Sequence, residues 1–240
     1  MEFFDLIRYV FQHLVCENSW DDSTVEIRVK TLTPEEAIGN PEHQDYPLIR
    51  GKERMMEADF LGSRGQAFTD MYGDFAGTLA EVAAMKLDNN YRRAIFLATL
   101  NAVARHLGIV RKTLHCKDDQ PPRCARELLS YIKENYGDPR VALVGLQPRM
   151  AEALAWEFEL RVTDMDADHV GTARFGISIQ GPEHNADNIA WCDLALVTGS
   201  TLTNDSMREL LTEKPTVFYG VTIAAPAHFL NLTRFCPYGI

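Results

Sequence analysis

His115, Cys116 and Cys124 most directly indicate chemistry, because they fall within ten residues of one another. Imidazole and thiolate are ligands that suit zinc, copper and similar ions. The spacing matches no closed zinc module, since it contains neither a paired C-x-x-C nor an H-x-x-x-H. A tetrahedral site would need one more ligand, for which the candidates are Cys236, Cys192 and His228. The three residues are therefore a candidate site for a transition-metal ion, and two packed thiols beside an unrelated histidine are the alternative.

Three glycine-containing turns supply a second set of candidates. Each turn follows a short apolar run typical of a buried strand; the turns are Val144–Pro148, Val197–Thr201 and Tyr219–Thr222. Backbone N–H groups and hydroxyls at such turns can bind an anionic or chelating small ligand. The candidate ligand-binding residues are Gly145, Gln147, Asp164, Gly199, Ser200, Thr201, Gly220 and Thr222.

These residues also have ordinary structural interpretations. Asp164 lies about where dinucleotide-binding folds place a ribose-binding acid, but an acid at a strand end is as readily a solvated turn residue. Asn204 and Asp205 are typical helix-capping residues. Gln147 and Pro148 replace glycines of the G-x-G-x-x-G fingerprint, which makes an NAD or FAD site less favoured.

The second half of the chain has the order of elements that would bring these turns together. Strands are expected near residues 140–145, 159–164, 174–180, 193–198 and 215–219, with helical patterns between them. This order predicts a parallel sheet with crossover helices. Ligands of such sheets bind beyond the carboxyl ends of the strands. We therefore expect the three turns to meet at one edge of the sheet.

The first half has strands followed by helices, an α+β order. We expect an amphipathic helix over residues 1–16, strands over 24–30, 55–61 and 66–69, and helices over 74–85 and 89–107. Gly62-Ser63-Arg64-Gly65 predicts the turn of a hairpin. A helix over 124–136, preceded by Pro121-Pro122, joins the two halves. The expected domains are residues 1–120 and 121–240.

Bulk properties narrow the class of protein. A net charge of −10 disfavours binding to duplex nucleic acid, which needs a basic face, although it does not exclude a local basic patch. No apolar run reaches the length of a membrane span. Five cysteines without a secretion signal are typical of a reducing compartment, so the expected location is the cytoplasm. The sequence leaves open whether the protein is a homo-oligomer.

The chain resembles, over nearly its whole length, the putative heavy-metal chelation family, a group labelled a domain of unknown function. The matching stretches are 60–62, 65–69, 98–103, 144–148, 197–203 and 218–223. The resemblance implies an enolase-N-terminal-like cap, a Rossmann-like domain and a cleft between them that binds a small ligand. In that family a further strand and helix usually follow the last loop, whereas this sequence stops at Ile240. No family role is carried over to His115, Cys116 and Cys124.

The expected function is that of a small-ligand-binding protein that takes part in heavy-metal chelation or metal-chelate processing. Its partner would be a small molecule or metal chelate, and its cofactor a transition-metal ion. The alternative is an enzyme that acts on a phosphorylated or nucleotide-like small molecule. A non-catalytic interaction protein is a third interpretation, because no nucleophile–base pair is visible in the sequence. Whether the protein is catalytic stays open.

Overall fold

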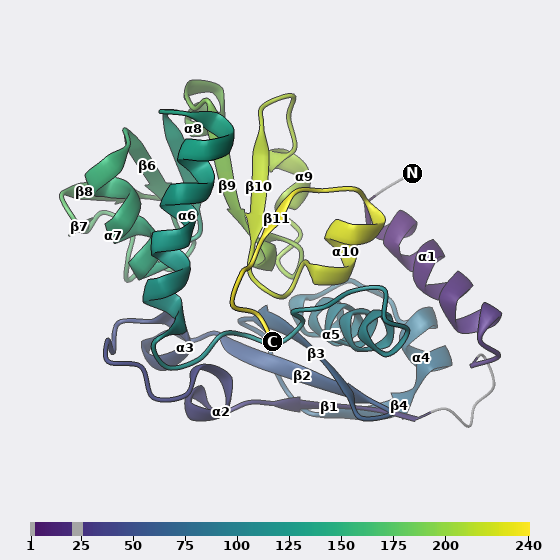
Figure 1. Cartoon of the computed structure of the whole chain (residues 1–240). Helices are drawn as coiled ribbons and strands as arrows, with labels where there is room; N and C mark the ends of the chain where they lie inside the picture. Colours follow the sequence, from purple (N-terminus) through teal and green to yellow (C-terminus); the bar gives the residue numbers. More distant parts are fainter. Residues whose placement is uncertain (1–2, 21–25) are drawn as a thin grey trace.

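The computed structural model describes residues 3–20 and 26–240, which form two sheets with helices packed on both. In Figure 1 the first sheet lies below, helix α5 (Asn90–His106) runs above it, and the second sheet stands above that helix. The strands of the second sheet are mostly parallel, and helices connect them. The predicted α/β class is therefore confirmed.

Within the described residues, the first sheet has four antiparallel strands in the order β3-β2-β1-β4. These strands are β1 (Glu26–Thr31), β2 (Arg54–Phe60), β3 (Ser63–Thr69) and β4 (Phe75–Thr78). The helices of this half besides α5 are α1 (Phe3–Glu17), α2 (Pro34–Ile38), α3 (Pro47–Arg50) and α4 (Leu79–Ala84). The predicted amphipathic helix is present as α1, which buries Ile7, Phe11 and Val15. Thr24 and Val25 of the predicted first strand lie outside the described residues.

The turn between β2 and β3 lies earlier in the chain than the predicted turn at residues 62–65. Phe60 pairs with Ser63, so Leu61 and Gly62 are the two turn residues, with φ of 51° and 80°. Positive φ at both positions is the signature of a type I′ turn, whose twist matches that of the flanking strands. Gly65, predicted in the turn, lies inside β3 instead.

Gly65 allows helix α5 to lie directly on the sheet. A Cβ atom at Gly65 would stand 2.3 Å from the backbone nitrogen of Ala102 and 2.5 Å from the carbonyl oxygen of Ala98. Helix α5 carries the small residues Ala98 and Ala102 where it faces Gly65, which has no side chain. The backbones of α5 and β3 therefore pack directly against each other. Every residue from Arg93 to Ala104 is buried, because the second sheet and its loops cover the other side of the helix.

The described part of the chain forms a second sheet of seven strands in the order β11-β10-β9-β5-β6-β8-β7. These strands are β5 (Val141–Val144), β6 (Leu160–Thr163), β7 (Ala173–Arg174), β8 (Ile177–Gln180), β9 (Leu194–Thr198), β10 (Thr216–Tyr219) and β11 (Arg234–Phe235). Its helices are α6 (Gln120–Tyr136), α7 (Pro148–Glu157), α8 (Asn185–Trp191), α9 (Met207–Leu210) and α10 (Ala224–Phe229). Strands β7 and β8 are antiparallel, and the other pairs are parallel.

Helices on the two faces of the second sheet belong to different clusters of buried side chains. One cluster contains residues of α6 and α7, and the other contains residues of α8, α9, α10 and α5. The chain leaves β5 toward α7 on one face and leaves β9 toward α9 on the other. The strand order thus reverses between the neighbours β5 and β9, and such a switch point opens a crevice at the carboxyl ends of the strands.

Two predicted helices differ from the structure at their starts. Residues 75–78 pair with β1 as strand β4, and α4 begins only after Thr78, which forms a reciprocal capping box with Glu81. The helix expected between the strands at 193–198 and 215–219 begins only at Met207, after a short 3₁₀ turn at 199–201. The Thr203 hydroxyl lies within hydrogen-bond distance of the carbonyl oxygens of Phe68 and Ser200.

None of the helices in residues 3–20 and 26–240 combines the length and apolar character that crossing a membrane requires. The division of the chain into domains near residue 120 stays a prediction.

Candidate functional site

The three glycine turns meet at one edge of the parallel sheet, as expected. They follow β5, β9 and β10, which are neighbours in the strand order. Gly145 adopts φ of 89°, and a Cβ atom there would lie 2.6 Å from Cγ2 of Thr198. The hydroxyl of Tyr219 donates to the carbonyl oxygen of Gly145 at 2.7 Å. We call this edge, with the turns at 145–148, 198–201 and 220–222 and the end of β6 at Asp164, the rim.

Part of the rim is occupied by contacts within the protein. Thr201 and Thr222 are 2% and 3% exposed. The hydroxyl of Thr201 donates to the carbonyl oxygen of Thr198 at 2.7 Å, and that of Thr222 accepts from the backbone N–H of Phe68 at 3.0 Å. Gly199 is buried against Ile223. These contacts hold the turns in place, and a ligand role for the three predicted residues stays a prediction.

The predicted ligand residues that stay partly exposed are Gly145, Gln147, Asp164, Ser200 and Gly220. The side-chain oxygen of Gln147 accepts from the N–H of Met150 at 2.6 Å and so caps α7. The carbonyl oxygen of Gly220 accepts from the guanidinium of Arg234. Ser200 Oγ lies 3.1 Å from Thr198 Oγ1. Ser200 therefore places a hydroxyl at the switch point between β5 and β9.

Asp164 ties the end of β6 to the Gly145 turn. Its Oδ2 accepts from the N–H of Leu146 at 2.6 Å, and its Oδ1 accepts from that of Asp166 at 2.8 Å. Nδ1 of His169 lies 3.3 Å from Oδ1. The two backbone N–H groups hold the Asp164 carboxylate in a fixed position at the rim.

Carboxylates of the first half face this charge, and the sequence analysis missed them. Glu53 directly precedes β2 and Asp70 directly follows β3. The pairing of Arg54 with Thr69 places them side by side at the open end of the hairpin. Burial, followed by the charges of Asp164, Asp70 and Asp166, raises the pKa of Glu53 to about 8. The sequence signal for Glu53 and Asp70 was an acidic residue at each open end of the predicted hairpin, which the register of β2 and β3 brings together.

Replacing Glu53 with glutamine is expected to remove a loss of stability that the wild type shows as the pH rises from acid toward about 8. The folded-state pKa of about 8 exceeds the ordinary 4.5, so the folded protein binds the proton more tightly than the unfolded chain. The wild type should lose stability as the pH rises from about 4.5 to 8, by about 2 kcal/mol after allowance for partial solvent contact. Urea unfolding at pH 5 and pH 9 measures this loss. The exposed control Glu42→Gln should keep it, and its persistence in Glu53→Gln would contradict the assignment.

The predicted metal ligands lie near one another, together with Cys236. Burial and then the charge of Cys236 raise the pKa of Cys116 to about 12. Burial and then the charges of Cys116 and Cys236 raise the pKa of Cys124 as well. Without a metal these thiols are therefore protonated at neutral pH, and a metal ion that bound them would displace their protons. The predicted fourth candidate Cys192 lies elsewhere, in the core, with its thiol donating to Ile189.

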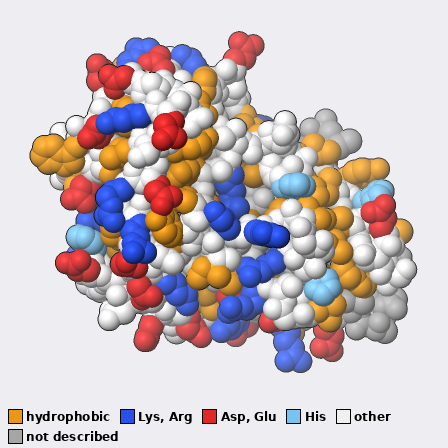
Figure 2. All heavy atoms as spheres, in the orientation of Figure 1, with side chains coloured by type: hydrophobic (Ala, Val, Ile, Leu, Met, Phe, Trp, Pro, Cys, Tyr) orange, Lys and Arg blue, Asp and Glu red, His pale blue; other side chains and the backbone are white. Residues whose placement is uncertain are grey.

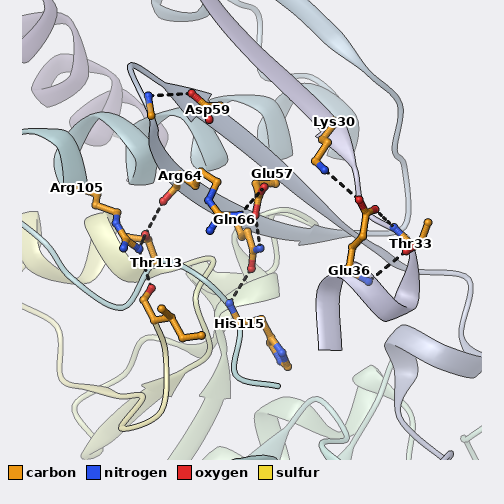
Figure 3. A network of polar contacts seen from close by, with 12 residues as sticks. Lys30, Thr33, Glu36, Glu57, Asp59, Arg64, Gln66, Arg105, Thr113 and His115 are labelled. Atoms are coloured by element: carbon orange, nitrogen blue, oxygen red, sulfur yellow. Dashed lines mark hydrogen bonds and ion pairs between the residues drawn. The ribbon is translucent and has the colours of Figure 1, made fainter. Parts of the chain in front are cut away.

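His115 is held by a polar network from the first sheet (Figure 3). Its backbone N–H donates to Oε1 of Gln66 at 2.7 Å, and Nε2 of Gln66 donates to Glu57 at 2.7 Å. Nδ1 of His115 lies 2.6 Å from the carbonyl oxygen of Cys116, which can only accept, so Nδ1 carries the proton. Burial lowers the pKa of His115 to about 4. The imidazole is thus neutral at pH 7, with its lone pair on Nε2.

Among the residues that the structure describes, no three His, Cys, Asp or Glu side chains are grouped so that they could hold a metal ion. Direct coordination by His115, Cys116 and Cys124 therefore stays a prediction, beside the alternative of two packed thiols and an unrelated histidine.

Hydrogen bonds join the first half to the ends of three neighbouring strands. Asn101 of α5, fully buried, donates through Nδ2 to the carbonyl oxygens of Gln66, Val221 and Thr222. Its Oδ1 accepts from the N–H of Ala225 at 2.8 Å. This side chain connects β3 and α5 to the turn after β10.

Two further contacts repeat this connection at β9 and β5. The Thr203 hydroxyl, after β9, bonds to Phe68 of β3 at 2.8 Å. Arg149 of α7, after β5, is only 7% exposed and donates to Asp45 at 2.7 Å. Nδ1 of His43 lies 3.1 Å from the same guanidinium. The rim is thus attached to the first half at three successive strands.

Fold and rim define an α/β protein with a parallel sheet, a switch point and an α+β unit attached to its carboxyl edge. Residues 128–230 match the model of the DUF364 family, described as putative heavy-metal chelation. The resemblance predicted from the sequence is thereby confirmed over these residues. No curated protein matches the chain.

Two solved structures of DUF364 proteins of unknown function are similar to this chain. The protein from Pyrococcus horikoshii is 14% identical with a TM-score of 0.56, over 92% of this chain and 80% of that one. The protein from Desulfitobacterium hafniense DCB-2 is 13% identical with a TM-score of 0.49, over 74% of this chain and 72% of that one. The first likeness supports the fold; at this identity it carries no functional residue across.

Proposed function

We propose that the protein binds a small, positively charged ligand, and a metal chelate in particular, at the rim. The carboxylates of Glu53 and Asp70 from the first half and of Asp164 and Asp166 from the second would surround it. The observation that carries the proposal is the placement of like charges from both halves around one half-buried glutamate.

Among the described residues, no ion pair includes Glu53 or Asp70, and Asp164 lies 3.3 Å from Nδ1 of His169. Every neighbouring charge that acts on the pKa of Glu53 raises it, and none is a lysine or arginine. Gathering carboxylates in this way costs free energy, which a bound cation would recover. This electrostatic cost is therefore expected at a site that binds a cation.

A chelate fits these carboxylates better than a bare ion. No described group of three potential ligands is arranged to coordinate one ion. Carboxylates spaced more widely can still hold a larger cationic molecule by charge and hydrogen bonds, with the metal carried inside the ligand as cargo. The hydroxyl of Ser200 and the turn at Gly145 add polar groups at the switch point.

A helix that begins at the Gly199 turn would favour the alternative, an enzyme for phosphorylated or nucleotide-like molecules. Residues 199–201 form a 3₁₀ turn, and α9 has only four residues. The sum of peptide dipoles that attracts phosphate to a helix start is therefore small here. The acidic neighbours of Glu53 also oppose an anion at the rim.

Hexaamminecobalt(III) tests the proposal, because it is a cationic metal complex that keeps its own ligands. Isothermal titration calorimetry at pH 8.5 should detect its binding to the wild type. The double variant Asp70→Asn with Asp166→Asn should bind it about tenfold more weakly, since two attractive charges are lost. Both amides can still accept the bonds that Asn90 and the Asp168 N–H donate to these positions.

A matched control removes two charges at the other end of the sheet. Asp138→Asn with Glu159→Gln changes exposed residues just before β5 and β6. This control should bind hexaamminecobalt(III) within about twofold of the wild type. Absence of binding to the wild type, or equal weakening in both double variants, would refute the proposal.

A further inference from the structure

A groove of about 510 Å³ lies on the opposite side of the rim from Asp164, along α10 and β11. One wall is the segment Ile109–Lys112 that follows α5, and the other comes from α10 and residues 232–237. Figure 2 shows lysine and arginine side chains gathered across the middle of this face of the molecule. Such a concentration stands out in a chain whose net charge is −10.

The charges that line this groove are all basic. Arg111, Lys112 and Arg234 contribute cations, His228 contributes an imidazole, and no aspartate or glutamate is among the lining residues. Within the described residues, neither Arg111 nor Lys112 forms an ion pair. Their positive charges are therefore available to a ligand.

Arg234 is the fixed member of this group. Its Nε donates to the carbonyl oxygen of Gly220 at 2.9 Å, and its terminal nitrogen donates to that of Lys112 at 2.6 Å. Both acceptors are neutral, so they orient the guanidinium without cancelling its charge. Within the described residues Arg234 forms no ion pair with a carboxylate, and an anion in the groove would supply such a partner.

The backbone at Lys112 is shaped to support this arrangement. Lys112 adopts φ of 61°, the left-handed region that a side-chain-bearing residue rarely occupies. Its carbonyl oxygen is the acceptor for Arg234. Strain of this kind persists where the surrounding structure enforces it, and it concentrates at ligand-binding sites.

Most of the other lining residues are apolar, and Cys236 adds a thiol. Val110, Ala224, Leu232 and Phe235 form part of the walls. A volume of this size is in the range of small-molecule sites, which combine apolar walls with a few placed polar groups.

We propose that this groove binds a small organic anion that carries a phosphate or carboxylate group on an apolar body. The anionic group lies between Arg234, Arg111 and Lys112, and the body packs against the apolar walls. This site is separate from the carboxylates at the rim and takes a ligand of the opposite charge. It also supplies the local basic patch that the net charge leaves possible.

Phenyl phosphate is a suitable probe, with phenol as its uncharged counterpart. Calorimetry should detect phenyl phosphate binding to the wild type, while phenol binds at least about tenfold more weakly. The double variant Arg111→Glu with Lys112→Glu changes two exposed side chains. It should weaken phenyl phosphate binding about tenfold or more, because two attractions become repulsions.

Charge reversal on α3 and charge removal at the rim supply the controls. Arg50→Glu, an exposed change on α3, should leave phenyl phosphate binding within about twofold of the wild type. The rim variant Asp70→Asn with Asp166→Asn should also leave it unchanged, so the two proposals can fail independently.

Vesicles distinguish the source of the anion. Co-sedimentation with phosphatidylglycerol vesicles but not phosphatidylcholine vesicles, lost in the Arg111→Glu and Lys112→Glu double variant, would assign the anion to a lipid headgroup. Phenyl phosphate binding without vesicle binding would assign it to a soluble molecule. Failure of both ligands to bind the wild type, or equal binding of either by the double variant, would overturn the proposal.

Discussion

Replacing Asn101 with alanine is expected to lower the free energy of unfolding by about 3–5 kcal/mol. The change removes a fully buried amide that donates to three carbonyl oxygens and accepts from one N–H. Each buried polar group left without a partner costs about 1–3 kcal/mol. The affected groups belong to Gln66, Val221, Thr222 and Ala225, so the loss falls on the junction between the two halves.

Urea unfolding followed by tryptophan fluorescence and circular dichroism measures this effect. Asn135→Ala is the matched control, because that exposed amide makes one bond to the carbonyl oxygen of Tyr131. The control should change the free energy of unfolding by less than about 0.5 kcal/mol. A loss below about 1 kcal/mol for Asn101→Ala would mean that water satisfies the exposed groups and that the amide does not hold the junction.

Replacing Gly65 with alanine should also destabilise the protein strongly, by about 3 kcal/mol or more. The added Cβ would meet backbone atoms of α5 at 2.3 Å and 2.5 Å, and backbone cannot move aside as a flexible side chain can. The helix would have to move away from β3, and the contacts of Asn101 on the same helix would lengthen.

Thermal unfolding of Gly65→Ala and Gly73→Ala provides the comparison. A Cβ at Gly73 would approach the Tyr91 ring at an ordinary 3.4 Å, and Gly73 is not in the left-handed region. The Gly73 variant should keep the melting temperature of the wild type within a few degrees or raise it slightly. Equal melting temperatures for both variants would show that α5 tolerates a wider separation from the sheet.

Local sequence patterns predicted the parallel sheet well. The apolar runs before Gly145, Gly199 and Gly220 are strands, because strands covered on both faces need continuous apolar segments. The expectation that their turns converge required only the rule that parallel strands end at one edge. The ends of helices were harder to predict: Thr78 and Glu81 carry a capping signal, but the strand before them depends on pairing with β1.

The candidate site was only partly predictable, since its carboxylates come from segments far apart in the chain. Asp164 follows a recognisable strand. Glu53 and Asp70 become informative only once the hairpin register is known and the first half is placed against the rim. Asn101 sits in the middle of an Ala-rich helix, where an amide is unusual, but its partners in the turn after β10 are non-local.

Attachment of the rim at three successive strands has a consequence for the kinetics of binding. Because Asn101, Thr203 and Arg149 each tie one strand end to the first half, separating the halves would break hydrogen bonds at all three strands. Ligand capture should then proceed without domain closure, as a single bimolecular phase whose observed rate rises linearly with ligand concentration. The association rate would be set by diffusion and charge attraction, and it would fall as salt is added.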